Sequence, residues 1–153
     1  MADTARFRSL VEKLESIIFA VDEGITHIRP AQDKWSLKEI IGHLIDSASN
    51  NHQRFVRLQL GNLQNFPTYD KDLWISAQKY NQMDWKDITA LWSSFNRMLL
   101  KVIEHMDTNA LGNVWTIDDK ELALELIVND YFRHLEWHIG HFEERLRELT
   151  EDR

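Results

Sequence analysis

The sequence predicts an all-α protein, a four-helix bundle with a long crossover between the second and third helices. Apolar residues recur at helical spacing in four long segments of the 153-residue chain. The chain has five glycines and two prolines, so few sharp turns interrupt it and regular structure should dominate. Long amphipathic helices pack around one core as a bundle. We therefore expect a single domain over residues 1–153.

The first two helices are predicted from apolar periodicity and from a start signal. In the first, apolar residues follow the i, i+3, i+4 pattern over about residues 7–21. The second begins at a capping box, in which the side chains of Ser36 and Glu39 each accept a hydrogen bond from the other's backbone amide. We expect it to run to about Leu60, before Gly61.

The segment from residue 61 to residue 83 breaks the helical pattern. It contains Pro67 and many polar residues, with a short helical piece expected around residues 72–80. A connection of this length is often functional or covers part of the body. Its aromatic residues suggest that it packs onto the bundle: Phe66, Tyr69, Trp74 and Tyr80.

Two more helices are predicted in the second half of the chain. Asp84 can cap the third, which should run to about Met106. A second connection, residues 107–118, holds Trp115. The last helix is expected to be the longest, over about residues 119–149.

Composition and charge exclude several classes of function. The chain has 25 acidic and 18 basic side chains, a net charge of −7, which argues against nucleic acid as a partner. It has no cysteine, which excludes disulfides, thiolate metal sites and a cysteine nucleophile. No apolar stretch approaches the roughly 18 residues of a membrane helix, and no signal peptide is visible. We therefore expect a cytoplasmic protein with no membrane partner.

The arrangement of the histidines is the most informative feature. His134 and His138 lie one helical turn apart at the edge of the apolar face of the last helix. His43 lies at the corresponding edge of the second helix. The three side chains could converge on one metal ion and leave positions open for water and substrate, as in catalytic rather than structural sites.

Two interpretations of the histidine spacing remain open. An i, i+4 pair also arises by chance in a helical chain with seven histidines.

His141 lies one turn beyond His138, farther toward solvent. It could support the site from outside or be a solvated surface residue.

The chain resembles the DinB-like family of four-helix bundles, and within it the branch of YfiT-type metal-dependent hydrolases and bacillithiol transferases. The resemblance spans roughly residues 30–147. Three stretches carry it: Lys34-Trp-Ser-Leu-Lys-Glu-Ile-Ile-Gly-His-Leu-Ile-Asp-Ser47; Arg54-Phe55 with Pro67-Thr-Tyr69 and Trp74; and His134-Leu-Glu-Trp-His138-Ile-Gly-His141.

The resemblance implies a divalent metal, nickel or zinc, bound by His43, His134 and His138, and it also implies a homodimer. Imidazole suits both metals. The chain departs from the family pattern in two places. Trp137 precedes His138 where the family often has a second histidine, and residues 113–116 read Asn-Val-Trp-Thr where the branch often has His-Pro. These departures bear on the substrate rather than on the metal.

The expected function is that of a metal-dependent enzyme acting on a small molecule. A metal held by three neutral imidazoles lowers the pKa of a bound water or thiol. The chain would then be a thiol S-transferase of the bacillithiol type, using a low-molecular-weight thiol, or a hydrolase. The alternative is a non-catalytic, dimeric bundle that binds a metal or a small ligand. A fourth protein ligand such as His141 would favour that alternative.

Asp46 and Arg54 are the candidate catalytic residues. Asp46, one turn from His43, could act as a general base or support a ligand, or it could be a solvated helix residue or a helix-capping partner. Arg54 could hold a substrate carboxylate or pair with an acidic residue such as Asp46 or Glu143. Tyr69 and Trp74 could form a lid over the site or simply pack.

Overall fold

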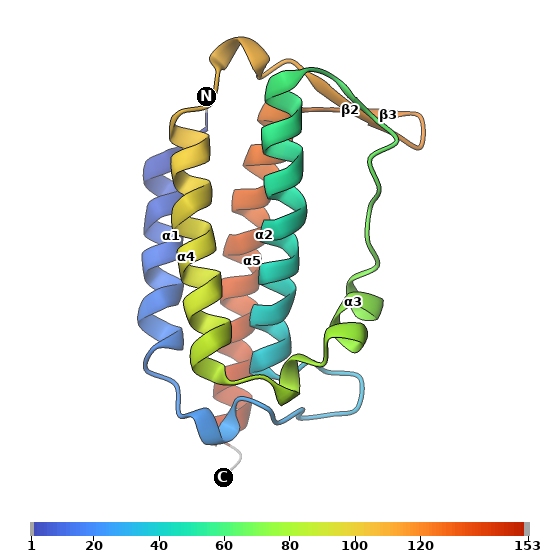
Figure 1. Ribbon diagram of the computed structural model, residues 1–153. Helices are drawn as coiled ribbons and strands as arrows, with labels where there is room; N and C mark the ends of the chain where they lie inside the picture. Colours follow the sequence, from blue (N-terminus) through green and yellow to red (C-terminus); the bar gives the residue numbers. More distant parts are fainter. Residues whose placement is uncertain (1, 152–153) are drawn as a thin grey trace.

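The computed structural model describes residues 2–151 and confirms a four-helix bundle. Its four long helices are α1 (Thr4–Ile18), α2 (Leu37–Leu60), α4 (Trp85–Glu104) and α5 (Leu124–Glu151), which run alongside one another (Figure 1). A 3₁₀ turn, η1 (Glu23–Ile25), lies between α1 and α2, and another, η3 (Thr108–Ala110), follows α4. No helix in residues 2–151 is long and apolar enough to cross a membrane.

The long crossover gives the bundle its topology. After α2 the chain returns along the outside of the bundle, so α2 and α4 run in the same direction (Figure 1). The returning segment contains the helix α3 (Lys71–Gln78) and the 3₁₀ turn η2 (Tyr80–Gln82), which confirms the helical piece expected at residues 72–80. Six residues, 79–84, therefore separate the end of α3 from the start of α4 at Trp85.

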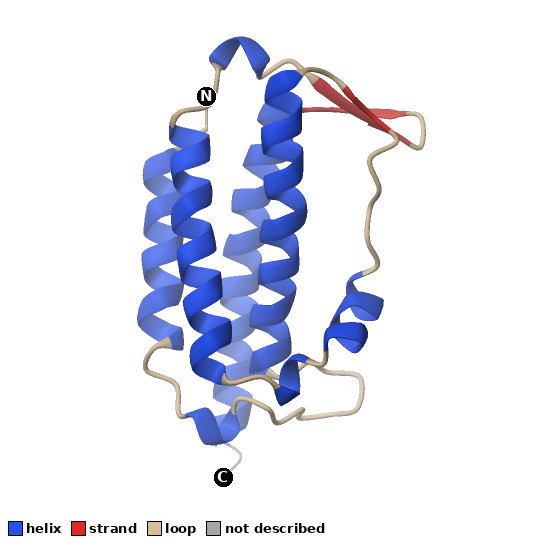
Figure 2. Cartoon of the chain, in the orientation of Figure 1, coloured by secondary structure: helices blue, strands red, loops and turns tan. Residues whose placement is uncertain are grey.

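A small sheet caps one end of the bundle, and the sequence did not predict it. Its strands are β1 (Leu63–Gln64), β2 (Val114–Ile117) and β3 (Lys120–Ala123), with β2 in the centre (Figure 2). β1 pairs with β2 in parallel, and β2 pairs with β3 in antiparallel fashion. The expected start of the last helix at residue 119 was wrong. Asp118 and Asp119 adopt φ angles of 47° and 61°, as a tight hairpin turn requires, and α5 begins only at Leu124.

The predicted apolar faces form most of the core. The capping box at Ser36 and Glu39 is present, and the predicted face of α2 is buried from Leu37 to Leu58. On α4 the apolar spacing predicts that Leu91, Trp92, Met98 and Leu99 face the core, and this was partly wrong, because Leu91 and Met98 are 53% and 42% exposed. Trp92 and Leu99 are buried as predicted, and Asn96, Leu100 and Ile103 point inward with them.

Candidate metal centre

Three histidines from two helices come together inside the bundle. The Nε2 atom of His134 lies 3.2 Å from Nε2 of His43 and 3.1 Å from Nε2 of His138. The three ligand atoms all lie within 4.8 Å of one another. His134 and His138 share one edge of α5 because they are four residues apart, and α2 places His43 opposite them. The structure thus brings together the three histidines that the sequence singled out.

The separations between these nitrogens suit a bound metal. Two nitrogens about 2.0–2.1 Å from one ion, at an angle of roughly 90–110°, are about 2.8–3.4 Å apart. Both short separations in the cluster fall within that range. In the described part of the chain the cluster contains no carboxylate and no fourth histidine. The donor set therefore fits a metal with three imidazole ligands and further positions open.

Burial keeps these imidazoles neutral, which is the form that binds metal. Desolvation and the neighbouring charges of His134 and Lys71 lower the pKa of His43 to about 3. Desolvation and the adjacent histidines lower the pKa of His138 to about 2. Desolvation also lowers the pKa of His134. At neutral pH each ring therefore has a nitrogen lone pair available to a cation.

Aromatic side chains enclose the cluster. The ring of Trp35 lies 5.1 Å from that of His43, and Trp137 lies 4.7 Å from His138, centroid to centroid. Nζ of Lys71 lies 5.5 Å from the centre of a Trp35 ring. Trp35, Lys71, Trp137 and His138 also line a hollow on this side of the cluster. The sequence pointed to neither Trp35 nor Lys71 as a neighbour of the site, although Trp35 directly precedes the capping box.

His141 lies beside the cluster but outside it. Its ring centroid is 5.9 Å from that of His138, and its Nε2 lies 3.5 Å from a guanidinium nitrogen of Arg145. The side chain is half-buried, so the expectation of a solvated surface residue was wrong. Because Arg145 contacts its Nε2 and the ring lies beyond His138, His141 borders the centre and is not one of its three ligands.

Asp46 is buried and faces the crossover. Its Oδ1 accepts hydrogen bonds from the hydroxyl of Tyr80 at 2.7 Å and from Nε2 of Gln78 at 2.8 Å. Among the described residues, none forms a hydrogen bond with its Oδ2 or with Nδ1 of His43. Desolvation raises the pKa of Asp46, and the two hydrogen bonds partly offset that effect. The interpretation of Asp46 as a solvated residue was wrong. Its role as a general base stays a prediction.

A glycine of α2 marks where the crossover touches the helix. A Cβ atom added at Gly42 would lie 2.2 Å from Cδ2 of Tyr80, far inside van der Waals contact. Only glycine lets the Tyr80 ring lie against α2 and reach Asp46. Gly42 is therefore the sequence signal that could have located this contact, within the motif that precedes His43.

Arg54 lies on the same face of α2 as His43, closer to the sheet. Its guanidinium carbon is 4.3 Å from the centre of a Trp115 ring, and one terminal nitrogen donates to Oδ1 of Asn51 at 3.4 Å. The expected pairing with Asp46 or Glu143 was wrong. Asp46 bonds to the crossover, and Glu143 pairs with Lys13 at 3.1 Å.

A hollow of about 280 Å³ opens beside the cluster on the side of His134. Tyr69 lines it and packs on Trp74 with ring centroids 4.9 Å apart, so the expected packing role of Trp74 is present. Desolvation, with the charge of Asp46, raises the pKa of Tyr69 to about 12, so its phenol stays protonated. The remaining lining residues are Ser47, Asn51, Arg54, Trp115, Leu122, Ile127, Asp130 and Tyr131.

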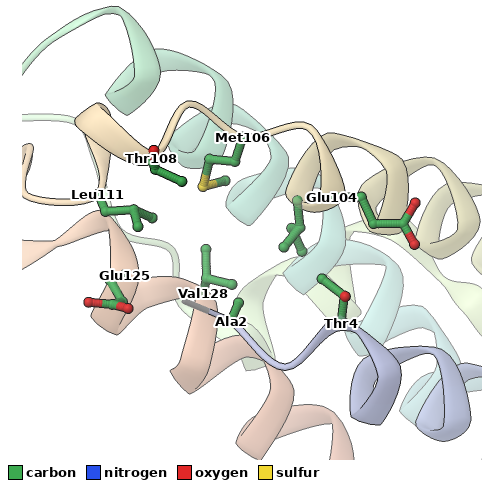
Figure 3. Close-up of a pocket in the computed structure, with 9 residues that line it drawn as sticks. Ala2, Thr4, Glu104, Met106, Thr108, Leu111, Glu125 and Val128 are labelled. Atoms are coloured by element: carbon green, nitrogen blue, oxygen red, sulfur yellow. The ribbon is translucent and has the colours of Figure 1, made fainter.

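A second hollow, of about 140 Å³, lies where α1 begins and α4 ends (Figure 3). Ala2, Met106, Leu111 and Val128 surround it, and its lining includes no histidine. It is therefore separate from the metal centre and offers no metal-binding group beyond the two carboxylates at its edge, Glu104 and Glu125.

Comparison with known proteins places this architecture in a family. The sequence matches the DinB superfamily over residues 2–144, and the chain belongs to that superfamily. Among solved structures, it is similar to YfiT from Bacillus subtilis, described as a probable metal-dependent hydrolase with an unusual four-helix bundle topology. The TM-score is 0.83 at 18% identity, covering 95% of this chain and 85% of that one. A DinB-like protein of the same organism, YjoA, gives a TM-score of 0.69 at 14% identity, covering 95% and 90%. No curated protein sequence matches the chain.

Proposed function

We propose that this member of the DinB superfamily is a divalent-metal-dependent enzyme whose three-histidine centre activates water or an external thiol. One observation carries the proposal: the cluster of His43, His134 and His138, with imidazoles kept neutral by burial and no fourth protein ligand in residues 2–151. Three protein ligands with open positions are typical of catalytic metal sites, whereas structural sites are closed by a fourth.

The protein's own residues would hold the metal, shield it and orient the substrate. A divalent cation bound there supplies Lewis acidity that lowers the pKa of a bound water or thiol. His43, His134 and His138 would bind it through Nε2. Trp35 would help to position the ring of His43, against which it lies. Tyr69 keeps its proton at neutral pH and can donate a hydrogen bond to a substrate in the adjoining hollow.

We propose nickel or zinc as the metal, and either thiol transfer or hydrolysis as the reaction. The similarity to YfiT, described as a probable metal-dependent hydrolase, supports metal-dependent chemistry on this fold. The chain has no cysteine, so a thiol nucleophile would have to come from a small molecule such as bacillithiol. A cytoplasmic location, where such thiols stay reduced, is part of this proposal.

Metal analysis of the purified protein tests the proposal. We expect about one nickel or zinc ion per chain by inductively coupled plasma mass spectrometry, because three neutral imidazoles form a ready site. His138→Ala should lose the metal and keep the helical circular dichroism spectrum, whereas His27→Ala, at an exposed position, should keep both. Wild-type protein without stoichiometric metal, after incubation with either ion, would contradict the proposal.

A reaction panel separates the two chemistries from the non-catalytic alternative. Metal-loaded protein is offered an aryl halide with bacillithiol, glutathione or mycothiol, and separately a set of activated esters and amides. Turnover that His138→Ala abolishes would identify the reaction class. Stoichiometric metal without turnover on either set would favour the dimeric metal-binding module.

A further inference from the structure

We propose that the hollow beside His134 binds a small carboxylate substrate with an apolar body, and that Arg54 is the residue that holds its carboxylate. This inference rests on the proposed function, because it takes the histidine cluster as the reacting centre. It adds the class of substrate and the residue that recognises it.

Arg54 is a buried cation to which residues 2–151 supply no anionic partner. Only 9% of it is exposed, and its Nε has no hydrogen-bond partner within that part of the chain. Among residues 2–151 no carboxylate forms an ion pair with it. Its contacts are the stacking on Trp115 and one long hydrogen bond to Asn51. A guanidinium stays charged in proteins, and an unpaired buried charge is destabilising, so this arrangement favours binding of an anion.

The guanidinium is held in a shape that suits a carboxylate. The guanidinium lies over the Trp115 ring, which restricts its position, and Asn51 contacts only one of its terminal nitrogens. The remaining N–H groups leave a planar fork that matches two carboxylate oxygens. Asp130 also lines the hollow, but it is exposed and pairs with Arg133, so it does not neutralise Arg54.

The rest of the hollow sets the size and polarity of the ligand. Its volume of about 280 Å³ lies just below the usual range of ligand sites, which is about 300–1,000 Å³. Trp115, Leu122 and Ile127 supply apolar lining. The ligand is therefore a small molecule with an apolar body, not an extended polar one.

The position of Arg54 along α2 separates the carboxylate from the reacting centre. Ser47, which lies 3.5 Å from Nδ1 of His134, precedes Arg54 by seven residues. At about 1.5 Å per residue the two positions are roughly 10 Å apart along the helix. A substrate held by Arg54 would thus extend its other end toward His134, which makes Arg54 a substrate-positioning group rather than a participant in bond breaking.

Calorimetric titration with 3-phenylpropionate and its neutral isostere 3-phenylpropionamide tests the proposal. We expect the acid to bind at least tenfold more tightly than the amide, in both chelator-treated and zinc-loaded protein. Arg54→Met should weaken binding of the acid at least tenfold and leave binding of the amide unchanged. Arg54→Lys, which keeps the charge but loses the fork, should give an intermediate affinity. Arg57→Met is the matched control, because Arg57 is exposed on the same helix and bonds to Gln53.

Several outcomes would overturn the inference. Equal affinity of wild-type protein for acid and amide would exclude recognition of the charge, without recourse to any variant. Binding that requires zinc and survives Arg54→Met would place the carboxylate on the metal instead. A lower melting temperature of ligand-free Arg54→Met would show that the cation is structural, whereas an unchanged or higher one supports a binding role. The metal content of the same samples reports separately on the proposed function.

Discussion

Replacing Tyr80 with phenylalanine removes one of the two hydrogen bonds that the buried carboxylate of Asp46 accepts. The Tyr80 hydroxyl donates to Oδ1 of Asp46 at 2.7 Å, and Gln78 supplies the other hydrogen bond. Oδ2 of Asp46 is already without a partner. The variant keeps the ring that packs against Gly42, so the change isolates the hydroxyl.

The expected cost follows from the charge of the acceptor. Hydrogen bonds to charged groups contribute about 1.5–3 kcal/mol to stability, and those between neutral groups about 0.5–1.5 kcal/mol. Tyr131→Phe is the matched control, because the hydroxyl of Tyr131 is also buried and donates at 2.7 Å to the neutral Oδ1 of Asn96. We expect Tyr80→Phe to cost about 2 kcal/mol at neutral pH and Tyr131→Phe about 1 kcal/mol.

The pH dependence gives the sharper test. Burial raises the pKa of Asp46, so the folded state holds its proton more tightly than the unfolded chain. The stability from Asp46 is therefore present below its unfolded pKa and is lost as the pH rises through the folded pKa. The Tyr80 hydrogen bond opposes this loss by favouring the carboxylate. Without this hydrogen bond the pKa of Asp46 in the folded state rises further. Tyr80→Phe should therefore lower the free energy of unfolding more at about pH 7 than near pH 4.

Urea denaturation of both variants, followed by circular dichroism at the two pH values, measures these differences. We expect the cost of Tyr80→Phe to grow with pH and that of Tyr131→Phe to stay constant. Equal costs for the two variants at both pH values would refute the reasoning, because they would show that Tyr80 does not stabilise a buried charge.

Three further predictions address the crossover contact, an ion pair and assembly. Gly42→Ala should destabilise the fold by about 1–3 kcal/mol through overpacking, whereas Gly140→Ala, with open space at its Cβ, should stabilise α5 by up to about 1 kcal/mol in urea titrations. Burial raises the pKa of Glu15, but hydrogen bonds from Arg97 and Ser93 outweigh that effect and leave it lowered. Its contribution is therefore present above the unfolded pKa and lost as the pH falls through the folded one, and Arg97→Met should flatten the acid limb of the stability profile. The exposed apolar side chains of α4 are the physical reason to propose a homodimer, and light scattering should give about twice the monomer mass of 18.2 kDa.

The metal centre could be predicted from the sequence because its geometry is mostly local. His134 and His138 share a helix edge through their spacing alone. The capping box fixes where α2 begins and makes its apolar face easy to read, so His43 could be placed at the edge of that face. The convergence of the two edges then needed only the packing of two amphipathic helices, which the bundle provides.

The partners of Asp46 and Arg54 could not be predicted, because they come from segments without helical periodicity. Asp46 bonds to Tyr80 and Gln78 in the crossover, whose path depends on long-range contacts. Arg54 lies over Trp115, which belongs to β2, whereas the sequence predicted only a connection over residues 107–118. The Asp118-Asp119 turn was the available signal for that hairpin, although two aspartates are a weak one beside Asn-Gly.

The small sheet therefore matters to the site as well as to the fold. Nε1 of Trp115 donates to the backbone oxygen of Phe66 at 3.1 Å, and β2 pairs with β1 at the start of the same crossover. These contacts tie the indole that orients Arg54 to the segment that delivers Tyr69 to the hollow. Loosening the β1–β2 contact should thus disturb Arg54 and Tyr69 together, while the three histidines, which come from α2 and α5, keep their positions. The proposed recognition of a carboxylate therefore depends on the sheet and the proposed binding of a metal does not, although both use side chains of α2 and α5.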